Sequence, residues 1–218
     1  MKKIVAISAG RKNKISDKAI QVVLNNLDFK NKFYSLSDFE LLTCDACNRC
    51  VSDNLCIKDD MLNKIFKDMI DSDAIIFAGP EYWDGANAKT RAFWERICFS
   101  GRHNSYFPLE DKPGVILGIS GTGKSEFVIK DISRFMQDAK IDIIKKLAIQ
   151  GEYACFTCGY GEDCKVGGVY ELYPHEPKIN KCKIPSLNNQ HPQDSQAGNN
   201  IKKELIEVAD YINNLLKS

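Results

Sequence analysis

Short apolar runs alternate with segments of helical periodicity along the first 150 residues, and this alternation constrains the fold more than any other feature of the sequence. Strands are predicted at residues 2–9, 31–38, 73–80, 112–120 and 141–151. Helices are predicted at residues 15–27, 62–70, 86–99, 124–139 and 201–215. This order predicts an α/β domain with a parallel sheet and helices on both faces. Ligands bind such sheets beyond the carboxyl ends of the strands, so the polar loops that follow the strands are expected to gather on one edge.

The segment at 151–199 breaks this pattern. Cysteine, glycine, proline, asparagine and glutamine dominate it, which is typical of an irregular insertion rather than a packed layer. The helix that follows places its apolar residues on one stripe, formed by Ile201, Leu205, Val208, Ile212 and Leu215. We therefore expect a single domain over 1–218, with a cysteine-rich insertion at 151–199 before the C-terminal helix.

Charge and hydropathy exclude several classes of protein. The net charge of +1 implies no basic face, so a nucleic-acid partner is not expected. No apolar run approaches the roughly 20 residues that cross a bilayer. The apolar run near the N-terminus is too short for a signal peptide. The sequence thus predicts a cytoplasmic protein with neither a nucleic-acid nor a membrane partner.

Nine cysteines are present, and an odd number in a reducing compartment argues against a disulfide framework. One compact loop, 44–56, contains four of them: Cys44, Cys47, Cys50 and Cys56. Two-residue spacers let successive thiolates turn toward one centre, and four cysteines are the standard ligand set of a [4Fe–4S] cluster. Zinc also accepts four cysteines, and free or redox-active thiols are the third interpretation.

A second group of cysteines lies in the insertion and forms a candidate second metal site, made of Cys155, Cys158, Cys164 and Cys182. It is interpreted as a second cluster, as a zinc site that stabilises a segment without a core, or as unligated thiols. His175 and His191 are nearby in the sequence and are interpreted as solvated loop residues. Cys98 stands alone and is predicted to be a buried thiol.

The loop SAGRKNKIS, residues 8–16, joins the first strand to the first helix. Its small residues allow close backbone approach, and Arg11 and Lys12 supply positive charge. Asn13 and Ser16 can donate hydrogen bonds, and the helix N-terminus adds free N–H groups. The loop is predicted to bind an anion, the alternative being a plain solvated turn.

Two further loops follow strands. In GPEYWDGANAKTRAFWER, residues 79–96, Pro80 ends the strand and Tyr82 and Trp83 offer aromatic faces to a planar ring; alternatively they only cover the helix end. GISGTGKS, residues 118–125, matches the phosphate-binding pattern G-x-x-x-x-G-K-[ST] between a strand and a helix. No convincing strand ends in an aspartate that would hold Mg²⁺: the strand at 31–38 is a weaker one, and Asp142 precedes its strand. A glycine-rich loop against the edge of a bound ring is therefore favoured over a nucleoside triphosphate site.

The order of these elements resembles the iron–sulfur flavoproteins within the flavodoxin-like NAD(P)H-dependent FMN reductase family. The resemblance covers about residues 1–160. It is carried by the first loop, the compact cysteine motif, the two aspartates at 59–60, and the segments AGPEYW (78–83) and AKTRAFWER (88–96). It implies a flavodoxin-like fold, a five-stranded parallel sheet in the order 2-1-3-4-5, and bound FMN. It also implies that the four cysteines of the 44–56 loop hold a [4Fe–4S] cluster.

The resemblance assigns roles to the three loops. It implies that the first loop takes the FMN phosphate, through Ser8, Arg11, Lys12, Asn13 and Ser16. It implies that one side of the flavin ring is lined by Pro80, Glu81, Tyr82 and Trp83, and the other side by Ser120, Gly121, Thr122 and Gly123. The sequence departs from the family in the first loop, where Gly10 replaces the usual proline, Ala9 the usual serine, and Lys14 and Ile15 the usual Gly-Asn.

The expected function is electron transfer by an oxidoreductase that contains FMN and a [4Fe–4S] cluster. FMN exchanges two electrons with a hydride donor or acceptor, or one at a time with the cluster, and the cluster passes single electrons to or from a ferredoxin-like carrier. The expected partner is a ferredoxin-like electron carrier or NAD(P)H. By the resemblance, the protein is expected to form a homodimer or homotetramer in which a cluster lies near the flavin of another subunit. The alternatives are an NAD(P)H-dependent FMN or quinone reductase whose cysteines bind zinc or stay free, and a P-loop nucleotide-binding protein.

Overall fold

The computed structural model of the chain describes residues 2–103, 106–152, 166 and 195–217. Cys155, Cys158, Cys164 and Cys182 lie outside the described residues, as do His175 and His191.

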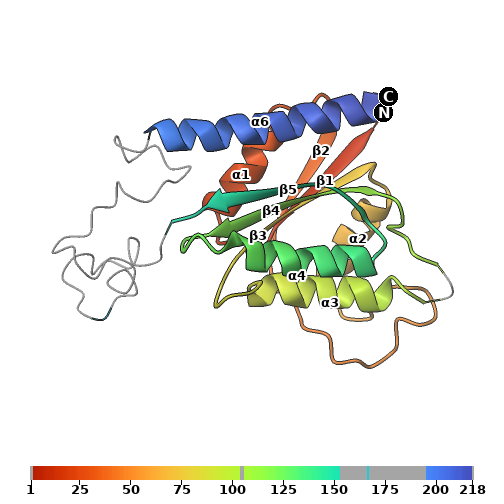
Figure 1. Ribbon diagram of the computed structural model, residues 1–218. Coiled ribbons are helices and arrows are strands. Elements are labelled where there is room, and N and C mark those ends of the chain that lie inside the picture. Colours follow the sequence, from red (N-terminus) through yellow and green to blue (C-terminus); the bar gives the residue numbers. More distant parts are fainter. Residues whose placement is uncertain (1, 104–105, 153–165, 167–194, 218) are drawn as a thin grey trace.

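Five parallel strands form one sheet at the centre of the molecule (Figure 1). The strands are β1 (Lys3–Ser8), β2 (Lys30–Ser35), β3 (Ala74–Pro80), β4 (Pro113–Ser120) and β5 (Asp142–Gln150). Their order is β2-β1-β3-β4-β5, which confirms the predicted topology. The central strand, β3, is buried along its whole length and ends at Pro80, as the sequence predicts.

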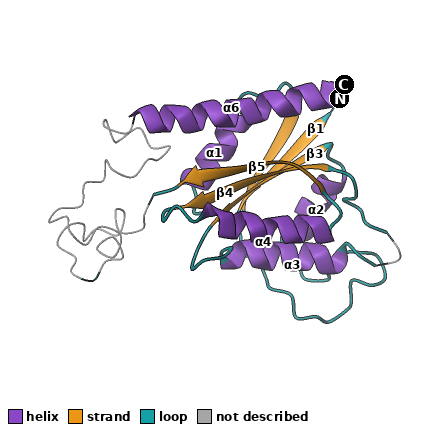
Figure 2. Ribbon diagram, viewed as in Figure 1, coloured by secondary structure: helices purple, strands orange, loops and turns teal. Residues whose placement is uncertain are grey.

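Helices cover both faces of the sheet (Figure 2). They are α1 (Ile15–Leu24), α2 (Leu62–Ile70), α3 (Ala88–Ser100), α4 (Ser125–Asp138) and α6 (Ser195–Lys217). Alternate residues of each inner strand enter different cores: Val5 and Ile7 of β1 pack with α2, α3 and α4, whereas Ile4 and Ala6 pack with α1 and α6. Because both faces are covered, the inner strands read as continuous apolar runs in the sequence.

The last helix differs from its prediction in two respects. It begins at Ser195, inside the range that the sequence assigned to the insertion. Leu205, Val208 and Ile212 are fully buried, but Leu215 is exposed, and Leu216 packs against the core instead. A 3.6-residue period places positions four apart on nearly one line, so a stripe drawn from sequence can drift by one residue at its end.

The two edge strands carry lysines on their exposed parts. Lys30 and Lys32 are exposed on β2, and Lys145 and Lys146 are exposed on β5. Charged side chains at these positions discourage pairing of a sheet edge with another chain.

Candidate functional site

The loop after β1 is fixed from three sides. The backbone N–H of Ala9 donates to Ala78 O at 2.9 Å, which extends the sheet by one residue. Asn87 Nδ2 donates to Ala9 O at 2.8 Å, and Ser37 Oγ donates to Gly10 O at 2.6 Å. The loop therefore enters α1 along a defined path at the carboxyl edge of the sheet.

Gly10 allows a close approach that other residues would prevent. A Cβ at this position would lie 2.4 Å from Ser16 Oγ, and both Ser8 and Ser16 are buried. At the start of α1, the N-cap Lys14 makes no side-chain capping bond, so the first N–H groups of the helix are not capped by that side chain. Uncapped N–H groups and the positive end of the helix dipole suit an anion.

The predicted cations of this loop are on the surface. Arg11, Lys12 and Asn13 are all exposed, and Asn13 has a left-handed backbone (φ 57°). Lys12 Nζ lies 2.6 Å from Asp38 Oδ1, and this hydrogen bond raises the pKa of Lys12. The ammonium group is charged. Because both partners of this ion pair are largely solvated, the Lys12 side chain can reorient toward a bound anion.

Asp17 is a residue of this loop that the sequence did not single out. Its buried carboxylate accepts from the N–H of Asn13 at 2.7 Å and from Ser35 Oγ at 3.3 Å. It thereby ties the turn to the end of β2. An acidic residue in the first turn of a helix is common, so the sequence carried no signal for this role.

Glu81 connects the loops that follow β3 and β4. Its Oε2 accepts from Ser120 Oγ at 2.9 Å and from Thr122 Oγ1 at 3.2 Å, and its Oε1 accepts from the N–H of Asp84 at 2.8 Å. Glu81 is 9% exposed, so the carboxylate lies between the loops rather than in solvent. Hydrogen bonds through Glu81 therefore link the two loops that the sequence assigned to opposite sides of one ring.

The phosphate-binding pattern at 118–125 does not form an open phosphate cradle. A P-loop directs backbone N–H groups at a phosphate. Here the N–H groups of Thr122 and Lys124 both donate to Ser120 Oγ, at 3.1 and 3.0 Å. Lys124 Nζ pairs with Asp84 Oδ1 at 2.6 Å. The structure thus agrees with the preference against a nucleoside triphosphate at this loop.

The aromatic pair lies at the open side of these loops. Tyr82 is half exposed, whereas Trp83 is 99% exposed and has a left-handed backbone (φ 55°), as does Asp84. Two successive left-handed residues are unusual outside glycine and set the direction of the turn. The turn is attached to α4, where Asp131 Oδ2 accepts from the N–H of Ala86 at 2.8 Å.

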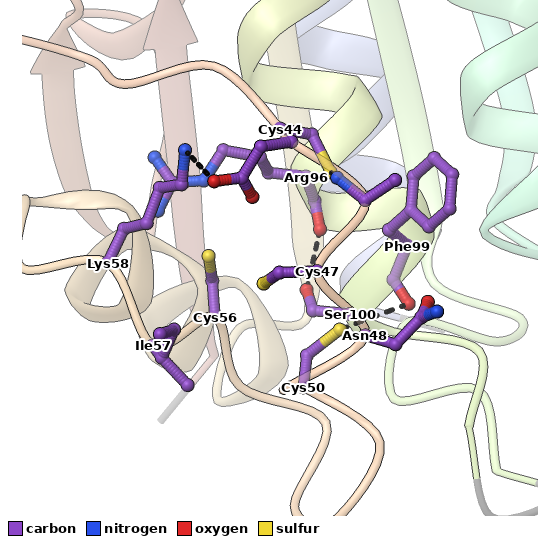
Figure 3. Close-up of a pocket in the computed structure, with 12 residues that line it drawn as sticks. Cys44, Cys47, Asn48, Cys50, Cys56, Ile57, Lys58, Arg96, Phe99 and Ser100 are labelled. Carbon is purple, nitrogen blue, oxygen red and sulfur yellow. Dashed lines mark hydrogen bonds and ion pairs between the residues drawn. The ribbon is translucent and has the colours of Figure 1, made fainter.

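The four cysteines of the 44–56 loop line one hollow (Figure 3). Its other walls include Lys58 and three residues of the last turns of α3: Arg96, Phe99 and Ser100. In the figure, Cys47, Cys50 and Cys56 bring their sulfur atoms toward the interior of this hollow. Among the described residues, no group of three or more His, Cys, Asp or Glu side chains is gathered closely enough to be a formed metal site.

The position of this hollow corrects one expectation. The cysteine loop follows β2, but it does not join the other loops at the carboxyl edge of the sheet. The loops after β1 and β3 meet at the N-terminal end of α3, where Asn87 caps the helix, while the hollow lies beside its C-terminal end. The thirteen residues of α3 span about 20 Å, because an α-helix rises about 1.5 Å per residue.

The cysteine loop is anchored to the segment after α3. Asn54 is buried, and its Nδ2 donates to His103 O at 3.0 Å. Cys50 Sγ lies 3.5 Å from His103 Nε2. Burial raises the pKa of the Cys50 thiol, and the charges of Cys56, Cys47 and Cys44 raise it further. A raised pKa favours the neutral thiol of Cys50, so a metal that binds this sulfur must displace its proton.

A buried ion pair supports the wall of the hollow. The guanidinium of Arg96 contacts the carboxylate of Asp60 through Nη1, and its Nη2 donates to Asp60 Oδ1 at 3.0 Å. The side chains are 0% and 5% exposed. The two residues are 36 positions apart, so no local sequence pattern announces this pair. Cys98, on the same helix, is a buried thiol as predicted, and burial raises its pKa to about 12.

Comparison with known sequences identifies relatives. The sequence model of the family described as NADPH-dependent FMN reductase matches residues 2–135. An iron-sulfur flavoprotein from Methanosarcina thermophila is 31% identical over 140 residues, which are 62% of this chain and 72% of that protein. An iron-sulfur flavoprotein from Methanocaldococcus jannaschii is 33% identical over 108 residues, which are 49% of this chain and 54% of that protein.

Comparison with solved structures gives the same fold. An azoreductase from Bacillus anthracis superimposes with a TM-score of 0.63 at 11% identity, over 97% of this chain and 100% of that chain. A flavodoxin from the domain Archaea superimposes with a TM-score of 0.50 at 9% identity, over 96% of this chain and 98% of that chain. At these identities the likeness shows the flavodoxin-like fold alone.

In the described part of the chain, no helix is both long enough and apolar enough to span a bilayer. The matched range, residues 2–135, is more than half of the 218-residue chain and contains the loops after β1, β3 and β4 as well as the four cysteines of the hollow. On this match, the chain belongs to the NADPH-dependent FMN reductase family of flavin oxidoreductases.

Proposed function

We propose that the protein is an electron-transfer flavoprotein that holds FMN and one [4Fe–4S] cluster, the cluster ligands being Cys44, Cys47, Cys50 and Cys56. The observation that carries this proposal is the single hollow that these four thiols line in a chain of a flavin reductase family. Two curated relatives that are about 30% identical are named iron-sulfur flavoproteins, which supports it. Bound FMN exchanges two electrons with NAD(P)H, and the cluster exchanges single electrons with a ferredoxin-like carrier.

The loops at the carboxyl edge fit FMN. The uncapped start of α1 offers N–H groups to the phosphate, together with Ser8, Arg11, Lys12, Asn13 and Ser16. Gly10 supports this fit, since a Cβ there would push into Ser16. One side of the flavin ring would contact Pro80, Glu81, Tyr82 and Trp83, and the other would contact Ser120, Gly121, Thr122 and Gly123. Glu81 keeps these two sets of residues at a fixed separation, because it bonds to both loops.

The hollow fits a cluster by its chemistry. It offers four sulfur donors, and a thiolate set of this kind is the usual ligand set of [4Fe–4S]. Its one acidic lining residue, Asp45, is engaged by Lys58 at 3.3 Å, which leaves the sulfurs as the available donors. The four sulfurs would bind the cluster from one loop. The backbone of this loop turns sharply, because Ala46, Asn48 and Asn54 have left-handed conformations.

Within one chain, the proposed flavin site and the proposed cluster site lie at opposite ends of α3. The flavin loops lie at one end, and the cysteine hollow lies at the other. We propose that electrons pass between a flavin and the cluster of another copy, in a homodimer or homotetramer. Size-exclusion chromatography with light scattering checks the assembly, and a monomer that still reduces its own cluster would contradict this arrangement.

A second candidate is an NAD(P)H-dependent FMN or quinone reductase in which the cysteines bind zinc or remain free. One observation favours its free-cysteine form: among the described residues no group of side chains has the compact geometry of a formed metal site.

Analysis of the anaerobically purified full chain separates the two. The proposed function predicts FMN together with about four iron and four sulfide per cubane, and a broad brown absorbance. Stoichiometric FMN with zinc, or with neither iron nor sulfide, would establish the second candidate instead. A Cys47→Ser, Cys50→Ser variant should lose the iron and keep FMN.

The second cysteine group needs its own variant. Replacing Cys155 and Cys158 by serine should leave the iron of the 44–56 loop in place. We propose that this group binds a metal as well, so the same variant should lose either zinc or a second set of iron. An unchanged metal content would mean that these thiols are unligated.

A further inference from the structure

Arg96 is a buried cation in the wall of the cysteine hollow. It belongs to the last turns of α3, its side chain is 0% exposed, and it lines the hollow together with the four cysteines (Figure 3). A buried guanidinium needs partners for all five of its N–H groups. Four of these five N–H groups can be followed in the structure.

Three of the N–H groups contact Leu42 and Asp60, which are not among the residues that line the hollow. Nη1 donates to Leu42 O at 3.0 Å and also contacts Asp60, and Nη2 donates to Asp60 Oδ1 at 3.0 Å. The Nε–H is buried and has no hydrogen-bond partner among the described residues. A buried donor without a partner is costly, and each such group in a folded protein needs an explanation.

Asp60 fixes the orientation of the guanidinium. Besides Arg96, its carboxylate accepts from the N–H of Leu42 at 3.0 Å and from the N–H of Leu62 at 3.1 Å. The carboxylate is thus held by backbone at both ends of the cysteine loop region. Arg96 cannot turn toward solvent without leaving this carboxylate buried and unpaired.

Cys56 lines the hollow together with Arg96 (Figure 3). Cys56 is fixed in turn, because its N–H donates to Asn63 Oδ1 at 3.1 Å. A cation and a proposed cluster ligand therefore line the same hollow from two anchored elements.

We propose that Arg96 is a positioning residue for the cluster: its unused N–H donates to the sulfur of Cys56, and the buried pair with Asp60 holds it there. This inference rests on the proposed function. Reduction adds one electron, and hence one negative charge, to the cluster. A hydrogen bond to a ligand sulfur and a fixed positive charge stabilise the reduced form, so Arg96 raises the reduction potential.

The test is a potentiometric titration of the anaerobically reconstituted full chain, followed by the cluster's electron paramagnetic resonance signal. Arg96→Lys retains a charge beside Asp60 but has no Nε–H to donate. We expect its cluster to be at least tenfold harder to reduce, which is about 59 mV for one electron. The flavin potential should not change, because the flavin loops lie at the other end of α3.

Lys58→Met is the matched control. Lys58 also lines the hollow, but its Nζ is engaged by Thr43 O at 2.6 Å and by Asp45. We expect a smaller shift in this variant than in Arg96→Lys. A shift in Lys58→Met with none in Arg96→Lys would overturn the proposal, since net charge rather than the Arg96 hydrogen bond would then set the potential.

A double variant covers the case in which Arg96→Lys fails to hold a cluster. Arg96→Met with Asp60→Asn removes both charges and leaves no buried carboxylate unpaired. A lowered cluster potential in this protein supports the proposal, and an unchanged one overturns it. Loss of the cluster in both variants with normal FMN content would assign Arg96 to the shape of the loop alone, and would also overturn it.

The two proposals fail in different ways. Wild-type protein that takes up neither iron nor sulfide would remove the proposed cluster, and this inference with it. Wild-type protein that holds a cluster, with the same potential in wild type, Arg96→Lys and the double variant, would contradict only the role of Arg96.

Discussion

At the scale of single residues, the loops at the carboxyl edge depend on a few buried polar side chains. Glu81 accepts hydrogen bonds from the loop after β4 and from its own loop. Asp17 accepts hydrogen bonds from the turn after β1 and from the end of β2. Neither carboxylate is free in solvent. The shape of the candidate flavin site therefore depends on side chains that need not contact the flavin.

Glu81→Gln tests this dependence. The amide nitrogen of glutamine cannot accept a hydrogen bond, so at least one of the donors Ser120, Thr122 and Asp84 loses its partner. We expect a loss of about 1–3 kcal/mol in the free energy of unfolding, and about tenfold weaker FMN binding. Urea unfolding and FMN titration of the apoprotein measure both. Glu204→Gln, at an exposed position in the interior of α6, should change neither.

Gly10→Ala tests the close approach between the first loop and α1. The new Cβ would overlap Ser16, so the turn or the helix start must move. We expect at least tenfold weaker FMN binding and a lower melting temperature. Lys12→Ala is the contrasting variant: it should weaken FMN binding without lowering the melting temperature, because the ion pair of Lys12 with Asp38 is largely exposed. Normal FMN affinity in Gly10→Ala would mean that this loop does not hold the phosphate.

At the scale of elements, the sequence predicts the sheet and its helices almost completely. The inner strands are recognisable because both of their faces are buried, so β1, β3 and β4 read as uninterrupted apolar runs. The loops after β1, β3 and β4 could be assigned to one edge because parallel strands end together. These elements could be predicted from local sequence patterns and from the rule that parallel strands end at the same edge of the sheet.

The parts of the candidate site that the sequence does not predict depend on contacts between residues that are distant in sequence. Nothing near Arg96 indicates that Asp60 is its partner, and nothing in the 44–56 loop indicates that it lies beside the end of α3. Asn87 lies inside the helix predicted at 86–99, but in the structure it is the N-cap of α3: its Oδ1 accepts from the N–H of Thr90, and its Nδ2 donates to Ala9 O, a contact distant in sequence.

The helix α6 makes a testable contribution at this scale. Leu205 is fully buried against the sheet, whereas the adjacent Ile206 is exposed. Leu205→Ala should lower the free energy of unfolding by about 2–5 kcal/mol, because it deletes buried methyl groups and leaves a cavity. Ile206→Ala should cost less than about 0.5 kcal/mol. Equal effects in urea unfolding would show that α6 does not pack with this face inward.

At the scale of the whole molecule, three ion-paired carboxylates make stability depend on pH. Burial would raise the pKa values of Asp60, Asp68 and Asp73, but partners outweigh it and lower all three; the main partners are Arg96, Lys32 and the N–H of Lys3. A folded pKa below the unfolded value adds stability at pH values above the unfolded pKa, which is about 3.9 for aspartate. That stability is lost as the pH falls through the folded values.

We therefore expect the free energy of unfolding to be nearly independent of these groups between pH 6 and pH 7, and to fall below about pH 4. Urea unfolding at a series of pH values measures the slope. Asp68→Asn should be less stable at neutral pH and should show a shallower loss in acid than the wild type. A wild-type curve that stays flat from pH 6 to pH 3 would contradict this assignment.

The lysines on the outer strands have a consequence for the protein in concentrated solution. Lys30 at one margin of the sheet and Lys145 and Lys146 at the other place like charges where two molecules would have to meet strand to strand, whereas Lys32 is paired with Asp68. Their mutual repulsion makes filament-like stacking unfavourable at neutral pH, and screening by salt weakens that repulsion. Long storage at high protein concentration should accordingly be safest in buffers of low ionic strength.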